Sequence, residues 1–201
     1  MSSVLEATPV ASSWLGLPPA LLDRVRLGIV RVFGRGPAAA GGIVWRPDVV
    51  VTNHHVVAGA RPPLRVVGLD GRAHAARVLE TSRGLDLALL DVPGAGLAPM
   101  PIGRSARLRV GALVFAVGHP WGQPWVVTAG VVSGLGTQPV RRGAEPRSYI
   151  RSDVRLAPGN SGGPLLDARG EVVGVNAMVI GGDLAVAIPS DVVGRWLGTE
   201  P

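Results

Sequence analysis

Eleven short apolar segments, each bounded by turn-forming residues, constrain the fold of this 201-residue chain more than any other feature. Glycine and proline contribute 29 and 18 residues, and both residue types resist helix interiors while favouring turns. We therefore expect an all-β fold and exclude a helical bundle. The segments are 29–33, 42–45, 49–52, 64–67, 75–79, 87–90, 112–117, 125–133, 149–152, 172–175 and 185–188.

Residues 1–19 differ from the rest of the chain. They are rich in serine, proline and small side chains, with Trp14, Leu15 and Leu17 as bulky anchors. This composition is typical of an extension rather than a core element. We therefore expect an N-terminal extension over 1–19 and one domain over 20–201.

Two helices are expected beside the strands. Residues 21–26 have the composition for one or two helical turns, and a longer helix is predicted at the end of the chain. There, Ser190 is expected to cap the N-terminus, Asp191 favours the first turn, and Gly198 stops the helix.

Composition excludes several kinds of chemistry. All 20 basic residues are arginine, so Schiff-base chemistry, a P-loop lysine and a Ser-Lys dyad are excluded. The chain has no cysteine, so it has neither a disulfide framework nor a thiol nucleophile. The formal net charge is +6, but the arginines are scattered and the longest adjacent run is Arg141 and Arg142. We interpret the charge as arginine replacing lysine throughout and expect no nucleic-acid partner.

Metal binding and membrane insertion have little support. The four histidines, one of which is His74, show neither a helical His-x3-His spacing nor cysteine partners, so we expect no metal and no cofactor. Residues 1–19 lack a basic segment followed by a long apolar run, and no later segment approaches about 18 uninterrupted apolar residues. We therefore expect a cytoplasmic protein that does not bind membranes.

The strongest chemical signal is the segment Gly-Asn-Ser-Gly-Gly-Pro-Leu at 159–165. Small neighbours leave the hydroxyl of Ser161 approachable, and glycines allow backbone N–H groups to converge on a developing oxyanion. The alternative interpretation is a plain glycine-rich turn. No histidine follows Ser161, which excludes the α/β-hydrolase order, and the chain lacks the alternating helices of the subtilisin fold. The remaining order of a catalytic triad is His, Asp, Ser.

Two histidines and one aspartate fit the other roles in that order. His54 and His55 both lie at the end of a predicted strand, within Thr-Asn-His-His-Val-Val at 52–57. Asp86 begins the apolar run Asp-Leu-Ala-Leu-Leu, where a carboxylate is costly unless it is hydrogen-bonded, for example to an imidazole. Asp86 could alternatively be a turn residue at the start of a strand, as Asp91 is expected to be at the end of the same strand.

Together these segments resemble the trypsin-like serine proteases of the HtrA/Deg family. The family's Thr-Asn-x-His-Val-Val, Asp-Leu-Ala-x-Leu and Gly-Asn-Ser-Gly-Gly-Pro-Leu motifs occur here in the same order, and shorter matches lie at 118–122, 152–153 and 187–191. The resemblance covers about residues 24–198. It concerns the protease domain, without the PDZ domains that members usually carry.

The resemblance implies a fold and a set of roles. The fold is two six-stranded antiparallel β-barrels with a short C-terminal helix, barrel one over about 24–105 and barrel two over about 106–201. The implied roles are His55 as general base, Asp86 as its orienting acid and Ser161 as nucleophile. Gly159, Asn160 and Ser161 form the oxyanion-hole segment, with the N–H groups of Gly159 and Ser161 as donors. His54 receives no role, and His119 is expected to be a turn histidine that packs on aromatic side chains.

The substrate pocket depends on which of two neighbouring residues faces inward. Arg155 lies where trypsin-like folds often form the pocket floor, and Leu156 matches an apolar residue that lines the pocket in HtrA-like proteases. Adjacent residues of an extended chain point in opposite directions, and a buried, unpaired arginine is costly. We therefore predict that Arg155 pairs with Asp153 on the outer side, and that Leu156 walls a shallow apolar pocket with Asn176, Ala177 and Val186.

The predicted function is endoproteolysis of unfolded or extended polypeptides through a His-Asp-Ser triad and an acyl-enzyme. The alternative is a catalytically silent peptide-binding or scaffold protein, which a flipped peptide at Gly159 would produce without any change of sequence. Related proteases form trimers through a comparable N-terminal segment, so we also predict a homotrimer assembled through residues 1–19.

Overall fold

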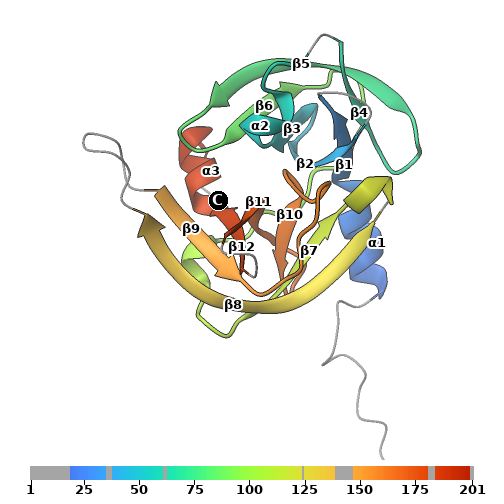
Figure 1. Ribbon diagram of the computed structural model, residues 1–201. Helices are drawn as coiled ribbons and strands as arrows, with labels where there is room; N and C mark the ends of the chain where they lie inside the picture. Colours follow the sequence, from blue (N-terminus) through green and yellow to red (C-terminus); the bar gives the residue numbers. More distant parts are fainter. Residues whose placement is uncertain are drawn as a thin grey trace, which may run out of the picture.

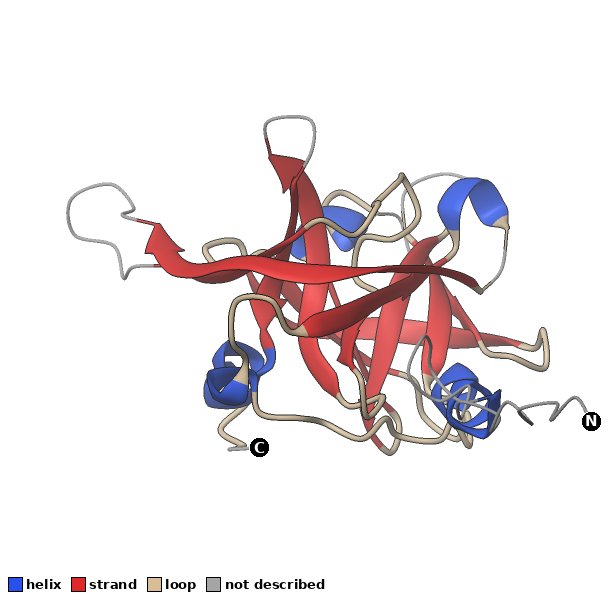
Figure 2. Ribbon diagram, turned by 90° about the horizontal axis from the view of Figure 1, so that it is seen from below, coloured by secondary structure: helices blue, strands red, loops and turns tan. Residues whose placement is uncertain are grey.

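Twelve strands of the described chain close into two antiparallel barrels (Figure 1). The computed structural model describes residues 19–34, 38–60, 63–123, 125–138, 147–180 and 184–199. Strand order is β1-β2-β3-β6-β5-β4 around barrel one and β10-β11-β12-β9-β8-β7 around barrel two. Figure 2 shows the strands forming the body of the molecule, with the short helices at its edge. The predicted fold of two six-stranded barrels with a short C-terminal helix is confirmed.

The elements of barrel one and its flanks are α1 (Pro19–Leu27), β1 (Ile29–Phe33), β2 (Ala40–Arg46), β3 (Val49–Thr52), α2 (His54–Val57), β4 (Leu64–Val67), β5 (Ala73–Ser82) and β6 (Leu87–Asp91). Those of barrel two and its approach are η2 (Ser105–Arg107), β7 (Leu113–Gly118), η3 (Pro120–Gly122), β8 (Val126–Gln138), β9 (Arg147–Ser152), β10 (Pro164–Asp167), β11 (Val172–Ile180), β12 (Leu184–Pro189) and α3 (Ser190–Trp196).

Pairing between β3 and β6 positions one part of the site. Thr52, the last residue of β3, lies opposite Ala88 near the start of β6. The residues that follow β3 and those that precede β6 therefore meet at the same end of barrel one. Alternate side chains of these strands, including Val50 and Leu90, fill the barrel interior and make this end rigid.

Strand β10 was absent from the eleven predicted segments. It pairs with β11 on one side and with β7 on the other, and it closes barrel two directly after the serine-containing segment. Leu165 points into the interior of barrel two, whereas Leu166 belongs to a larger apolar cluster that joins the barrels. That cluster also contains Val51 from barrel one and Val117 from barrel two, so the two barrels share one packed interface.

The ends of the chain differ from prediction in two details. Pro19, assigned to the extension, is the first residue of α1, while the rest of that segment, including Trp14, Leu15 and Leu17, lies outside the described residues. Ser190 does not cap α3, because its hydroxyl donates to the carbonyl of Gly103 at 2.7 Å and accepts from the N–H of Ser105 at 3.1 Å. Its hydroxyl therefore ties α3 to the connection between the barrels.

Candidate active site

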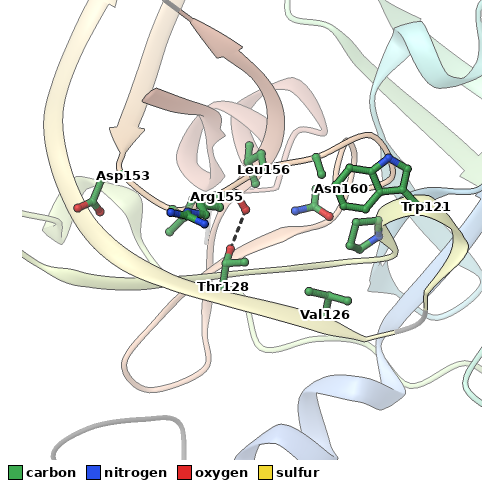
Figure 3. A pocket seen from close by; sticks show the side chains of 10 residues that line it. Trp121, Val126, Thr128, Asp153, Arg155, Leu156 and Asn160 are labelled. Carbon is green, nitrogen blue, oxygen red and sulfur yellow. Dashed lines mark hydrogen bonds between the residues drawn. The ribbon is translucent and has the colours of Figure 1, made fainter. Parts of the chain in front are cut away.

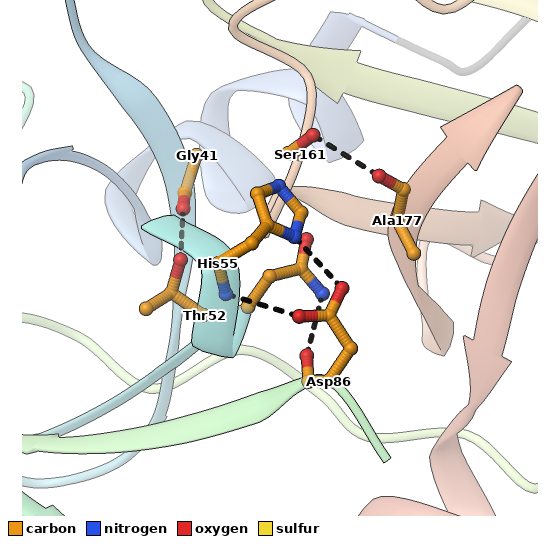
Figure 4. Close-up of polar contacts among 7 residues, drawn as sticks. Gly41, Thr52, His55, Asp86, Ser161 and Ala177 are labelled. Atoms are coloured by element: carbon orange, nitrogen blue, oxygen red, sulfur yellow. Dashed lines mark hydrogen bonds and ion pairs between the residues drawn. The ribbon is translucent and has the colours of Figure 1, made fainter. Parts of the chain in front are cut away.

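His55 and Asp86 form a closed pair in barrel one (Figure 4). The Nδ1 atom of His55 lies 2.8 Å from Oδ2 of Asp86, and the backbone N–H of His55 donates to Oδ1 at 3.0 Å. One carboxylate thus holds both the ring and the main chain of the histidine. This arrangement fixes the proton of a neutral imidazole on Nδ1 and leaves Nε2 as the acceptor.

The same pair shifts the titration of the histidine. The pKa of His55 is raised above its ordinary value, mainly by the hydrogen bond to Asp86 and further by the negative charge of that carboxylate. Partial burial of the ring lowers the pKa and offsets part of the effect. The imidazolium is therefore stabilised at this position, as a base that takes up a proton during a reaction requires.

The main chain of Asp86 is held as firmly as its side chain. Its φ is 57°, a left-handed conformation that is uncommon for residues other than glycine. Its carbonyl accepts from the backbone N–H of His54 at 3.1 Å and from the side-chain amide of Asn53 at 3.0 Å. These contacts at both ends of the residue determine where the carboxylate lies.

Ser161 lies on the far side of the His55 ring from Asp86 in the view of Figure 4. Its hydroxyl donates to the carbonyl of Ala177 at 3.1 Å, and no hydrogen bond joins it to His55 within the described residues. The structure thus brings the three predicted residues to one place and closes the His55–Asp86 bond. In this resting state the serine hydroxyl is directed at β11.

Barrel one also holds the backbone of the serine. The N–H of Gly41 on β2 donates to the carbonyl of Ser161 at 2.7 Å, and the hydroxyl of Thr52 donates to the carbonyl of Gly41 at 2.8 Å. A Cβ at Gly41 would collide with the backbone of Gly163, so the two barrels approach as closely as glycine allows. The position of Ser161 therefore depends on barrel one as well as on its own barrel.

The peptide before Gly159 has a defined orientation. The carbonyl of Pro158 accepts from the N–H of Trp121 at 3.1 Å, and the C=O and N–H of a trans peptide point in opposite directions. The N–H of Gly159 therefore points away from Trp121. Gly159 has a φ of 109°, and a Cβ there would collide with the carbonyl of His119.

The three amides of the predicted oxyanion segment are not equivalent. The N–H of Asn160 donates to the carbonyl of Ala157 at 3.0 Å, so it is already used. The N–H groups of Gly159 and Ser161 have no hydrogen-bond acceptor among the described residues. Two free donors, rather than three, remain for an oxyanion.

His119 packs behind this segment and is fully buried. Its ring meets Trp125 edge to face at 4.9 Å, in agreement with the expected aromatic packing, while Trp121 is largely exposed. The pKa of His119 is lowered to about 4, mainly by burial and further by the positive charge of Arg31, against an opposite effect of the Val30 backbone. The backbone N–H of His119 donates to the carbonyl of Gly159 at 3.2 Å, so this histidine supports the oxyanion segment through its main chain.

The predicted specificity residues divide between two places. Arg155 and Leu156 both line a pocket of about 580 Å³ together with Trp121, Val126 and Thr128 (Figure 3). Both residues therefore line this pocket; which of the two faces a bound substrate stays a prediction.

The expected pairing of Asp153 with Arg155 is also absent within the described residues. Asp153 instead accepts from the N–H of Val131 at 2.6 Å, because β8 passes beside it. The hydroxyl of Thr128 donates to the carbonyl of Arg155 at 2.9 Å and holds its backbone.

Asn176, Ala177 and Val186 do not line this pocket but lie on β11 and β12. Asn176 is 1% exposed, and its side-chain amide donates to the carbonyl of Pro164 at 2.8 Å. Its backbone pairs with the segment after Ser161: the N–H of Gly162 donates to the carbonyl of Asn176, and the N–H of Asn176 donates to the carbonyl of Gly163, at 2.8 Å each. Asn176 therefore supports the serine segment from behind and offers no surface to a substrate, contrary to the sequence-based prediction.

Three residues important to the geometry received no role from the sequence. Thr52 and Asn53 lie in the quoted motif, but their contacts are with Gly41 and Asp86, 11 and 33 residues away. Pro158 orients the following peptide through its backbone carbonyl, and a backbone contact of this kind cannot be read from a pattern of side chains in the sequence. Only the position of Thr52 and Asn53 directly before the histidines could have drawn attention to them.

The described residues hold neither a metal-binding cluster nor a membrane-spanning helix. No group of three or more histidine, aspartate or glutamate side chains is arranged to hold a metal ion in the described part of the chain. Among the described helices, none has the length and apolar character needed to cross a bilayer.

The sequence matches a family model described as a trypsin-like peptidase domain over residues 40–175. A protein of Hahella chejuensis named "Probable periplasmic serine endoprotease DegP-like" is 40% identical over 168 residues, covering 79% of this chain and 35% of that protein. "Protease Do-like 1, chloroplastic" of Arabidopsis thaliana is 38% identical over 169 residues, covering 79% of this chain and 38% of that protein. This chain thus spans little more than a third of the length of these curated relatives.

Solved structures of serine proteases also resemble this chain in their fold. The HtrA-type protease AlgW with tripeptide superposes with a TM-score of 0.78 at 28% identity, covering 89% of this chain and 61% of that chain. The serine endoprotease from Yersinia pestis gives a TM-score of 0.76 at 25% identity, covering 89% and 64%.

The relatives also correct one expectation. Several are named as periplasmic and one as chloroplastic, which points away from the cytoplasm. The sequence-based expectation of a cytoplasmic protein is therefore wrong. It relied on the composition of residues 1–19, which carries no information about how such relatives reach their compartments.

Proposed function

The chain belongs to the trypsin-like peptidase family, and from this premise we propose that it is a serine endopeptidase that cleaves unfolded or extended polypeptides. His55 acts as the general base, Asp86 orients it, and Ser161 is the nucleophile. The observation that carries the proposal is the 2.8 Å contact between Nδ1 of His55 and Asp86, which leaves Nε2 free on the side of Ser161 (Figure 4).

The reaction begins with the serine hydroxyl. Rotation about the Cα–Cβ bond of Ser161 transfers its hydrogen bond from the carbonyl of Ala177 to Nε2 of His55. The oxygen attacks the scissile carbonyl while His55 takes the proton, and Asp86 stabilises the imidazolium. His55 then gives the proton to the leaving amine, and a water molecule, deprotonated by His55 in turn, hydrolyses the acyl-enzyme.

The negative charge that develops on the carbonyl oxygen requires hydrogen-bond donors. The N–H groups of Gly159 and Ser161 fill this role, and the hydrogen bond of Asn160 to Ala157 removes its N–H from the hole. Donors that are already oriented need no rearrangement when the charge forms, which is why backbone amides are effective here.

Substrate preference at the residue before the cut follows from apolar side chains. The proposed lining is Ala177 and Val186 on β11 and β12, beside the Ser161 hydroxyl that contacts Ala177, together with Leu156 at the edge of the neighbouring 580 Å³ pocket; Asn176 supports β11 from behind. Small or branched apolar side chains such as Val, Ala, Leu or Ile fit such a surface. A peptide library in which Asp or Glu dominated this position would instead implicate Arg155.

The orientation of the Pro158–Gly159 peptide also weighs against the alternative of a silent scaffold protein. A silent protease fold would require the carbonyl of Pro158 to turn into the hole, which would break its 3.1 Å bond to Trp121. The observed bond supports a hole that is formed at rest. Trimer formation through residues 1–19, and the lack of nucleic-acid and membrane partners, remain predictions; residues 1–18 lie outside the described residues.

The test of this function compares one polypeptide in two states. We expect the protein to cleave a permanently unfolded polypeptide, with product masses that report apolar residues before the cut, and to spare the folded form. Ser161→Ala should abolish cleavage. Equal cleavage by the wild type and Ser161→Ala would contradict the proposal.

A further inference from the structure

Asn53 lies at the N-terminal end of a helix but does not cap it. It directly precedes α2 (His54–Val57) with φ −81° and ψ 149°, the backbone conformation of a helix N-cap. Asparagine is common there because its side-chain oxygen accepts a hydrogen bond from the first helical amides. Asn53 makes no such capping bond, and its Oδ1 is buried without a partner among the described residues. Capping therefore does not explain an asparagine at this position.

The amide nitrogen of Asn53 has a single partner, and that partner belongs to the proposed triad. The Nδ2 atom donates to the backbone carbonyl of Asp86 at 3.0 Å, while the whole residue is 0% exposed. The same carbonyl accepts from the N–H of His54 at 3.1 Å. Two donors on one carbonyl fix the plane of the peptide that follows Asp86.

Asp86 needs this support because of its conformation. A non-glycine residue with φ of 57° is strained, and it stays there only when its surroundings hold it. The two bonds to the carbonyl hold one end of Asp86, and the two bonds from His55 hold the carboxylate. Removing the amide of Asn53 would leave the main chain of Asp86 with one donor and allow the carboxylate to move relative to the imidazole.

We propose that Asn53 is a positioning residue for the reaction, acting through the backbone of Asp86 to set the contact between that carboxylate and His55. This inference rests on the proposed function, since it assigns a part in the same triad.

The test uses Asn53→Leu, which has the same number of side-chain heavy atoms but no amide, and Asn53→Ala, which avoids overpacking. We expect kcat to fall about 10- to 100-fold with KM changed less than ~2-fold, because the carboxylate is displaced while substrate contacts remain. The pKa of His55, followed by NMR of the imidazole and by the acid limb of the rate profile, should fall toward its ordinary value of about 6.5.

Asn176→Leu provides the matched control. Asn176 is equally buried, its amide also donates to a backbone carbonyl, that of Pro164 at 2.8 Å, and its Oδ1 is also unpartnered among the described residues. It has no contact with Asp86 in the described structure. The control should change the melting temperature by a similar amount while leaving the pKa of His55 unchanged.

The outcomes separate the possible failures. If both Asn53 variants lose stability but keep the wild-type kcat per folded molecule and the wild-type pKa of His55, Asn53 has only a structural role and the proposal is overturned. If the wild type has no peptidase activity, the proposed function fails. The imidazole titration then still decides whether Asn53 sets the His55–Asp86 contact.

Discussion

Barrel one holds its part of the site with side chains, whereas barrel two holds its part with the backbone. In barrel one, His55, Asp86 and Asn53 are connected by three hydrogen bonds, each of which uses at least one side-chain group. In barrel two, the segment around Ser161 is fixed by main-chain contacts and by the left-handed conformation of Gly159. A substitution in barrel one therefore acts by removing a functional group, while in barrel two the addition of a single Cβ is sufficient.

Two histidines near the site, the partly exposed His55 and the fully buried His119, show a second contrast. His55 has a carboxylate partner, and its pKa is raised. His119 has no partner for its ring nitrogens within the described residues, and its pKa is lowered to about 4. Residues of one type thus titrate in opposite directions, because Asp86 supplies a counter-charge to His55 whereas burial and the positive charge of Arg31 disfavour the charged form of His119.

The largest expected effect comes from removing the proposed nucleophile or its base. Ser161→Ala and His55→Ala should each lower kcat/KM by about 10⁴-fold or more, and the double variant should be little worse than either, because the residues act as a unit. Steady-state kinetics on an unfolded polypeptide provides the measurement. His54→Ala keeps its backbone N–H and serves as the control; additive losses in the double variant would contradict the triad.

Gly159→Ala tests the backbone set of barrel two. The added Cβ would collide with the carbonyl of His119, and a φ of 109° is strained for alanine, so the peptide should turn and the oxyanion donor should be lost. We expect kcat to fall about 10²- to 10³-fold with the pKa of His55 unchanged.

Gly59→Ala is the matched control for this substitution. Gly59 also has a positive φ, 69°, but a Cβ there meets nothing within 4 Å. It should cost stability through backbone strain alone and leave kcat near the wild-type value. Equal losses of kcat in the two variants would show that strain, and not the oxyanion segment, is responsible.

Acid should destabilise barrel two through His119. Because the folded-state pKa of about 4 lies below the unfolded value of about 6.5, the unfolded state takes up the proton first as the pH falls. The contribution of neutral His119 to the free energy of unfolding is therefore fully present above pH ~6.5 and is lost progressively as the pH falls to ~4. The total loss is about 3 kcal/mol.

Chemical denaturation at pH 7 and pH 4 measures this loss, with His119→Asn as the variant that cannot titrate. The wild type should lose about 3 kcal/mol more of its free energy of unfolding than His119→Asn over this range. Parallel losses in the two proteins would contradict the assignment to His119.

The smallest expected effect is on the dependence of kcat/KM on pH, which reports the titration of His55 and not that of His119. His55 must be neutral to accept a proton, so kcat/KM should rise with pH through an apparent pKa above 6.5 and then level off. In Asp86→Asn the residual activity should show this step at lower pH, because the hydrogen-bonded carboxylate is gone. A profile that is flat from pH 5 to pH 9 would argue against His55 as the base.

The parts of this molecule that sequence patterns predict are those carried by side chains. Ser161 and Asp86 could be selected because their chemistry and order restrict the possibilities, and the family resemblance singled out His55 from its neighbour His54; eleven of the twelve strands were located by their apolar runs. Strand β10 was left out because its apolar run is only Leu165 and Leu166 and it begins with proline, which is unfavourable inside a sheet. The roles of Pro158, Gly41 and Asn53 were not predictable, because each depends on a contact between segments distant in the chain.

Labelling with a fluorophosphonate tests the central claim most directly, because the reagent requires an activated serine and an open oxyanion hole but no particular substrate. Intact mass and peptide mapping should show one phosphonyl group on Ser161 in the wild type, with labelling at least ~10³-fold slower in His55→Ala and unchanged in His54→Ala. A wild-type protein that stays unlabelled, or a label on any other residue, would contradict the account.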